Sequence, residues 1–117
     1  MRTLFILNDP PYGTERVYNG LRLAHALAKN DGSAEITVFL MADAVLAAKA
    51  GQNTPDGYYN LGRMLKRVMA GKGHVLLCGT CLDARGIAEA EIMEGARRST
   101  MDELAAETIA ADKVLVF

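Results

Sequence analysis

The chain has 117 residues, 50% of them hydrophobic and 23% charged, which is the composition of one globular domain spanning residues 1–117. Its 13 basic and 14 acidic residues give a formal net charge of -1, whereas a dedicated nucleic-acid or anionic-membrane binder has a clear basic excess. No apolar run approaches the ~20 residues of a membrane span, and Leu4–Leu7 is too short for a signal peptide. We therefore expect a cytoplasmic protein that binds neither nucleic acid nor membrane.

The first half of the chain is predicted to form a strand, a helix and a second strand. Thr3–Leu7 is a short apolar run without polar alternation, which is typical of a strand buried on both faces of a parallel sheet. Thr14–Asn30 has apolar residues at helical spacing, and Thr14 is a suitable N-cap. Ile36–Met41 is the second apolar run, after which Asp43 can cap a short helix.

The second half of the chain repeats this alternation. Asp56 is the predicted N-cap of the next helix, and His74–Cys78 is a third apolar run. Ala96–Ser99 is a candidate for a short extra strand. Thr100–Glu103 has the sequence of a capping box for the last helix, and Lys113–Phe117 is the last apolar run. Strands that alternate with helices in this way predict an α/β fold with three layers.

The two cysteines, Cys78 and Cys81, form a C-x-x-C motif at the end of the third predicted strand. Reactive groups of open α/β sheets collect at the carboxyl ends of the strands, and a nucleophilic cysteine there needs a pKa below about 8.5. A helix N-terminus and Arg85 can both lower that pKa. Catalytic candidates are Cys78 as nucleophile, Cys81 as resolving thiol and Arg85, while Gly79 and Thr80 are substrate-binding candidates.

The loop after the first strand is predicted to open at the same edge of the sheet. Two prolines and a glycine make this loop stiff and sharply turned. We expect it to face the cysteine loop across one pocket, with Asn8, Tyr12 and Gly13 as substrate-binding candidates. The simpler interpretation of Tyr12 is a residue that packs beneath the loop.

Four interpretations of the cysteine pair compete. Both cysteines can be small buried hydrophobic residues, or they can form a dithiol redox pair. A thioredoxin-like motif follows an early strand and is accompanied by a later proline, whereas the last proline here is Pro55. A metal site needs further ligands, and His25 and His74 are not at ligand spacing. The fourth interpretation is a persulfide carrier.

Charged residues elsewhere have simpler interpretations. Glu89, Glu91 and Glu94 lie in one segment, and Arg97 and Arg98 follow them. Such a run of mixed charge is typical of a solvated surface. It could also dock a basic partner.

Several motifs occur in order along the whole chain, namely Pro11–Glu15, Leu21–Ala24, Phe39–Val45, Gly51–Gln52, Gly57–Tyr58, Cys78–Ile87 and Ala111–Leu115. With C-x-x-C-x-x-x-R-G at its centre, this set resembles the DsrE/DsrF-like sulfur-relay family, and most closely its YchN-like branch. The resemblance implies a three-layer α/β sandwich around a mainly parallel sheet of about five strands, with helices on both faces. It also implies a homo-oligomer, either a trimer or a hexamer.

The resemblance further implies a role for each cysteine. In sulfur-relay members a cysteine at the end of this strand accepts a persulfide from a donor protein and passes it to an acceptor, and Cys78 is the matching position. Cys81 matches the second cysteine of the YchN-like branch. A second thiol can attack a persulfide, which releases sulfide and leaves a disulfide.

The sequence therefore predicts a sulfur-relay or sulfur-reduction protein, a possible sulfurtransferase, that needs no metal or organic cofactor. The main alternative is a non-catalytic oligomeric binding or scaffold protein with structural or redox-sensing cysteines. A third possibility is a protein that binds a small anion between the two loops.

Overall fold

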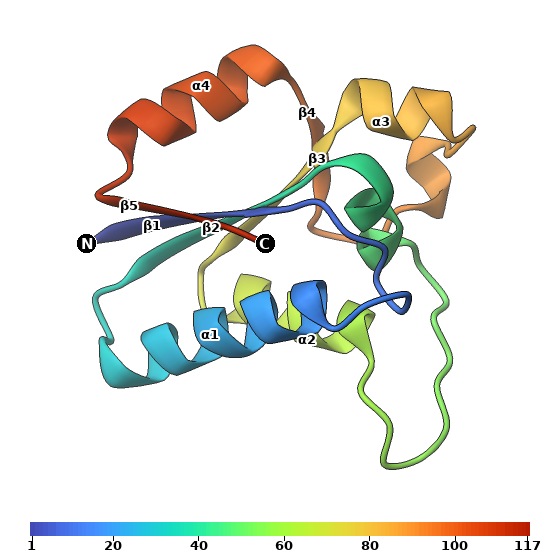
Figure 1. Cartoon of the computed structure of the whole chain (residues 1–117), viewed down its shortest axis with the longest axis horizontal. Helices are drawn as coiled ribbons and strands as arrows, with labels where there is room; N and C mark the ends of the chain where they lie inside the picture. The colour runs from blue at the N-terminus through green and yellow to red at the C-terminus, as the bar shows by residue number, and fades with distance from the viewer.

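Figure 1 shows a computed structural model of residues 1–117, in which one sheet separates two layers of helices. The elements in chain order are β1 (Arg2–Leu7), α1 (Arg16–Asn30), β2 (Glu35–Leu40), the 3₁₀ helix η1 (Ala42–Ala48), α2 (Leu61–Ala70), β3 (His74–Cys78), α3 (Gly79–Ala84), the 3₁₀ helix η2 (Glu89–Glu91), β4 (Arg97–Ser99), α4 (Met101–Ala110) and β5 (Lys113–Val116). The α/β class and the short strand predicted near Ala96–Ser99 are confirmed. None of the helices has the length and hydropathy needed to cross a bilayer.

The sheet has the strand order β4-β3-β2-β1-β5, and every neighbouring pair is parallel. Helices α1 and α2 lie together on one face, and α4 lies on the opposite face (Figure 1). The predicted three-layer sandwich is therefore confirmed. Because all strands are parallel, their carboxyl ends meet at one edge of the sheet, where β3 leads into α3 and β4 leads into α4.

A single cluster of 25 buried hydrophobic residues fills the space between the sheet and the helices. The central strands are buried on both faces, as the absence of polar alternation predicts, and Phe5 and Phe39 are among their fully buried side chains. Helix α1 packs closely on the sheet at Gly20, where an added Cβ would lie 2.8 Å from the Leu7 side chain. Helix α1 is thus packed directly on the end of β1 and on Phe117.

The predicted N-caps of α1 and of the 3₁₀ helix η1 are wrong. Helix α1 has Glu15 at its N-cap without a side-chain bond. The hydroxyl of Thr14, one residue earlier, donates to Asp9 at 2.9 Å and accepts from the N–H of Arg16, the first residue of α1, at 3.3 Å. The 3₁₀ helix η1 has no side-chain cap either. Asp43 instead forms an ion pair with Arg85 at 2.8 Å.

The predicted N-cap of α2 is also wrong, whereas the predicted N-cap of α4 is confirmed. The N-cap of α2 is Asn60 and not Asp56, because the Asn60 side chain accepts a hydrogen bond from the N–H of Arg63 at 3.1 Å. The cap of α4 is confirmed, because the hydroxyl of Thr100 accepts from the N–H of Glu103 at 3.1 Å. The carboxylate of Glu103 does not return to the cap and binds side chains of β4 instead.

Candidate functional site

Cys78 is both the last residue of β3 and the N-cap of α3. Its Sγ atom accepts a hydrogen bond from the backbone N–H of Cys81 at 3.3 Å and lies 3.3 Å from the hydroxyl oxygen of Thr80. Both cysteines are free thiols, and Cys78 is 7% exposed. The predicted position of Cys78 at the carboxyl end of a strand is confirmed. Gly79 and Thr80, two predicted binding residues, lie beside it.

The surroundings of the two thiols separate their pKa values. Burial raises the pKa of the Cys78 thiol, but hydrogen bonds from Cys81 and Thr80 outweigh it and lower that pKa below its ordinary value. Burial and the hydrogen bond to Cys78 raise the pKa of Cys81. Cys78 is therefore the member of the pair that becomes a thiolate first, and Cys81 is its hydrogen-bond donor.

The second thiol has its own backbone donor. The N–H of Ala42 donates to the Sγ atom of Cys81 at 3.2 Å. Ala42 directly follows β2 and Met41, and its φ of 50° lies in the left-handed region, which is uncommon for a residue with a side chain. This strained turn therefore directs an N–H group at the site.

Arg85 lies on the Cys81 side of the motif. Its guanidinium donates to the carbonyl of Cys81 at 3.1 Å and to the carboxylate of Asp43 at 2.9 Å. These contacts join the end of α3 to η1. Arg85 is thus close to the resolving thiol, and its contacts do not include the Cys78 sulfur, which sequence reasoning expected it to stabilise.

A cavity of about 170 Å³ opens between the carboxyl ends of β3 and β4. In the parallel register Cys78 pairs with Ser99, so the two strands end side by side. The lining residues come from β2, β3, β4 and the starts of α3 and α4, and they are Phe39, Cys78, Gly79, Thr80, Arg98, Ser99, Thr100 and Met101. Two larger cavities of about 430 and 480 Å³ lie at the amino ends of the strands and between α1 and α2, away from both cysteines.

Arg98 is the positively charged residue that lines this cavity. Its place in a run of mixed charge predicts a solvated surface residue instead. Its guanidinium packs against Gly79, where an added Cβ would lie 2.8 Å from the Arg98 Nε atom. Two nitrogen atoms of Arg98 donate to the carboxylate of Asp83 at 2.8 and 2.7 Å. The signal that points to Arg98 is its place in a short strand that ends beside His74–Cys78, and this place depends on the strand order.

The structure does not bring the loop after β1 to this cavity. Strand β2 lies between β1 and β3, so the two loops do not form facing walls as predicted. Asn8 donates to the backbone carbonyl of Phe117 at 3.3 Å, and the hydroxyl of Tyr12 accepts from the N–H of Leu61 at 3.1 Å. At Gly13, an added Cβ would lie 3.2 Å from the ring of Pro10.

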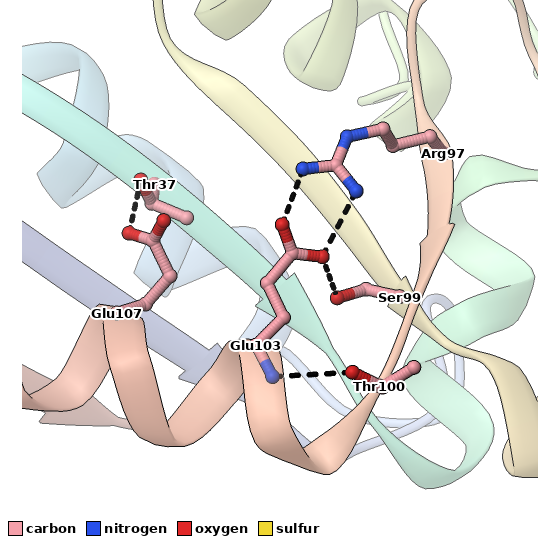
Figure 2. A network of polar contacts seen from close by, with 6 residues as sticks. All are labelled: Thr37, Arg97, Ser99, Thr100, Glu103 and Glu107. Atoms are coloured by element: carbon pink, nitrogen blue, oxygen red, sulfur yellow. Dashed lines mark hydrogen bonds and ion pairs between the residues drawn. The ribbon is translucent and has the colours of Figure 1, made fainter.

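Figure 2 shows the polar network that fixes the wall formed by β4 and α4. Arg97 and Ser99 both donate to the carboxylate of Glu103, and these bonds lower the pKa of Glu103 to about 2. One turn further along α4, Thr37 of β2 donates to Glu107 at 3.4 Å. The carboxylate of Glu103 is therefore paired with side chains of β4, and α4 is anchored to both β4 and β2.

A model of the DsrE/DsrF-like family matches residues 1–117. The protein YchN of Escherichia coli strain K12 is 41% identical over 116 residues, which are 99% of this chain and 98% of YchN. The uncharacterized protein MJ0989 of Methanocaldococcus jannaschii is 37% identical over 117 residues, which cover both chains completely.

Solved structures give the same result. The crystal structure of YchN from E. coli superposes with a TM-score of 0.92 at 42% identity and covers both chains completely. The protein MTH1491 of Methanobacterium thermoautotrophicum superposes with a TM-score of 0.78 at 15% identity, over 97% of each chain. This second likeness concerns the fold alone.

Proposed function

Because the chain belongs to the DsrE/DsrF-like family, which supports a role related to sulfur relay, we propose that Cys78 carries sulfur as a persulfide and that Cys81 is the resolving thiol. The observation that carries this proposal is the environment of the Cys78 sulfur. It lies in a cavity at the end of β3, and hydrogen bonds from Cys81 and Thr80 outweigh its burial and lower its pKa. A thiolate is the nucleophile this chemistry needs, and a lowered pKa increases the fraction of Cys78 in that form.

Loading is a thiol exchange reaction at the outer sulfur of a donor persulfide, R–S–SH. The Cys78 thiolate attacks that sulfur, a new S–S bond forms, and the S–S bond of the donor breaks. The donor leaves as R–S⁻ with the bonding electron pair, and the proton stays on the transferred sulfur. The N–H and hydroxyl donors that hold the thiolate of Cys78 also suit the persulfide that replaces it.

Unloading has two routes. In the first, the thiolate of an acceptor protein attacks the outer sulfur, and Cys78 leaves as a thiolate, which its lowered pKa favours. In the second, the thiolate of Cys81 attacks the inner sulfur, sulfide leaves as HS⁻, and a Cys78–Cys81 disulfide forms. A dithiol reductant then supplies the two electrons and two protons that restore both thiols.

The protonation of Cys81 decides between these routes. Burial and the bond to Cys78 raise its pKa, so Cys81 rests as a thiol and attacks slowly until it loses its proton. We therefore expect transfer to an acceptor to dominate while Cys81 is protonated, and sulfide release to become faster as the pH rises.

The test is to expose the reduced protein to a persulfide donor and to measure intact mass and released sulfide together. The wild type is expected to gain one sulfur atom, Cys78→Ser to gain none, and Cys81→Ser to gain sulfur without releasing sulfide. Loss of two hydrogens without any gain of sulfur would indicate a dithiol redox pair instead. Neither change, with Cys78 accessible to alkylation, would favour the oligomeric binding or scaffold function.

We also propose that the protein acts in the cytoplasm as a homo-oligomer, together with sulfur donor and acceptor proteins. A reducing compartment keeps free thiols such as Cys78 and Cys81 reduced. Apolar side chains of α4 and β5 are exposed, with Ile109 at 86% and Val116 at 65%, and association would bury them. Light scattering is expected to give the mass of a trimer or hexamer, and a monomeric mass would contradict this proposal.

A further inference from the structure

The guanidinium group of Arg98 has no part in the persulfide steps described above, although it lines the same cavity as Cys78. Arg98 pairs in register with Leu77, the residue before Cys78, and packs against Gly79 on the other side of the cysteine. Its hydrogen bonds to Asp83 raise its pKa most, and negative charge on Cys78 adds to this effect. A positive charge therefore lies on the wall of the cavity that Cys78 also lines.

The Asp83 carboxylate that binds Arg98 can be replaced by another anion. Asp83 holds the guanidinium by two hydrogen bonds, but the side chains are 40% exposed for Arg98 and 61% for Asp83. Ion pairs exposed to this degree contribute little, because water screens both charges. An anion that enters the cavity can therefore compete with Asp83, which positions Arg98 in the structure.

The size of the cavity limits what can bind there. Its volume is about 170 Å³. Sites for organic ligands are larger, at about 300–1,000 Å³. The hydroxyls of Thr80, Ser99 and Thr100 and the charge of Arg98 give this small space a polar lining. A short inorganic anion fits this volume and lining.

We infer that Arg98 determines the donor specificity of Cys78 and selects a short inorganic hydrogen polysulfide anion, HS–Sn⁻. This inference rests on the proposed function. The Cys78 thiolate attacks the protonated terminal sulfur, a new S–S bond forms, and the next S–S bond of the chain breaks. The remaining chain leaves as the dianion Sn²⁻ with the bonding electron pair. Arg98 offsets the repulsion between the two reacting anions and stabilises the dianion that leaves.

The charge of the cavity can be tested without any sulfur transfer. Iodoacetate and iodoacetamide are similar in size and differ by one negative charge, and both alkylate a thiolate with loss of iodide. The rate ratio of iodoacetate to iodoacetamide at Cys78, followed by peptide mass mapping, reports the charge that the thiolate experiences. We expect Arg98→Gln to lower this ratio roughly tenfold, as the loss of a unit charge close to the sulfur predicts.

The chain offers a matched control in the neighbouring residue. Arg97→Gln removes the same charge one position away, but Arg97 binds Glu103 and does not line the cavity. Because successive side chains of a strand point to opposite faces, the ratio should change less than about twofold. Asp83→Asn should raise the ratio, because it frees Arg98 from its competing anion. Arg98→Lys keeps the charge and should retain a ratio above that of Arg98→Gln even if the glutamine variant is less stable.

Sulfur loading then separates this inference from the proposed function. Loading of Cys78 by hydrogen polysulfide should be roughly tenfold slower in Arg98→Gln, whereas loading by the persulfide of cysteamine, whose ammonium group balances the negative charge of its persulfide, should be much less affected. Equal loss with both donors, or an unchanged alkylation ratio, would overturn the role of Arg98. If no donor loads the wild-type Cys78 while the alkylation ratio still falls, the proposed function fails and Arg98 is an anion-binding residue only.

Discussion

The backbone N–H of Cys81 donates to the Sγ atom of Cys78 over 3.3 Å, so the second cysteine of the C-x-x-C motif contributes a capping bond to the first. The spacing of three residues is that between an N-cap side chain and the N–H it binds in the first helical turn. The motif at a strand-to-helix turn thus makes the first sulfur a helix cap. A capping sulfur is held best as a thiolate, because the N–H groups around it favour negative charge.

Removal of the second donor to this sulfur should make Cys78 less acidic. Thr80→Val keeps the shape of the side chain but loses the hydroxyl, which lies 3.3 Å from the Cys78 sulfur. Burial disfavours the thiolate, and the variant has one hydrogen-bond donor fewer to offset the effect of burial. The pKa of Cys78 should therefore rise. The measurement is the pH at which iodoacetamide alkylation of Cys78 reaches half its maximal rate.

A control for this experiment is Thr80→Ser, which keeps a hydroxyl at the same position and should keep the wild-type midpoint. The wild-type midpoint itself is expected below that of an ordinary cysteine thiol. A Thr80→Val midpoint equal to that of the wild type would show that the hydroxyl does not act on the sulfur.

Gly79 is predicted to be required for the position of Arg98. Gly79→Ala would place a Cβ 2.8 Å from Nε and 2.9 Å from Cζ of Arg98, so the guanidinium must move and its bonds to Asp83 should break. Alanine is a good helix former, and the fold should persist. We expect the iodoacetate to iodoacetamide ratio at Cys78 to fall towards that of Arg98→Gln. Gly32→Ala is the control, since an added Cβ there meets nothing within 4 Å.

Glu103 should make the stability of the protein depend on pH in the acid range. Hydrogen bonds from Arg97 and Ser99 lower its pKa from 4.5 to about 2. A pKa that is lower in the folded state stabilises the protein above the unfolded value, and this stabilisation is lost as the pH falls from about 4.5 to about 2. Because Arg97 is 59% exposed, we expect about 1 kcal/mol rather than the full value of the shift.

The corresponding experiment compares the free energy of unfolding in urea for the wild type and Glu103→Gln between pH 2 and pH 7. The difference should be constant above pH 5 and should shrink towards zero near pH 2. A difference that stays the same at every pH would mean that Glu103 stabilises α4 by packing and not by its charge.

Much of the fold could be predicted because it depends on local patterns. Runs such as His74–Cys78 are apolar without alternation, and this pattern indicates strands buried on both faces. The cap of α4 was also predictable, because Thr100 and Glu103 satisfy a local spacing rule. Asp43 and Asp56 satisfy the same kind of rule, but Asp43 binds Arg85 and the cap of α2 lies four residues after Asp56.

The site could be predicted only in part, because its second wall depends on tertiary structure. Cys78 belongs to a strand with a clear pattern, and its place at a strand end followed from the sequence. Arg98 reaches the cavity because a strand of only three residues pairs with β3, and no local pattern fixes that pairing. Asn8 and Tyr12 lie elsewhere because β2 separates their loop from the cysteines, which requires the strand order.

The most direct test of the account locates transferred sulfur within the wild-type chain. After exposure to hydrogen polysulfide, blocking with iodoacetamide and digestion with trypsin, both cysteines lie on the peptide Gly73–Arg85, so fragment ions that separate Cys78 from Cys81 are needed. We predict one additional sulfur atom on Cys78 and none on Cys81. Additional sulfur on Cys81 alone, or on neither cysteine, would contradict the assignment of Cys78 as the sulfur carrier.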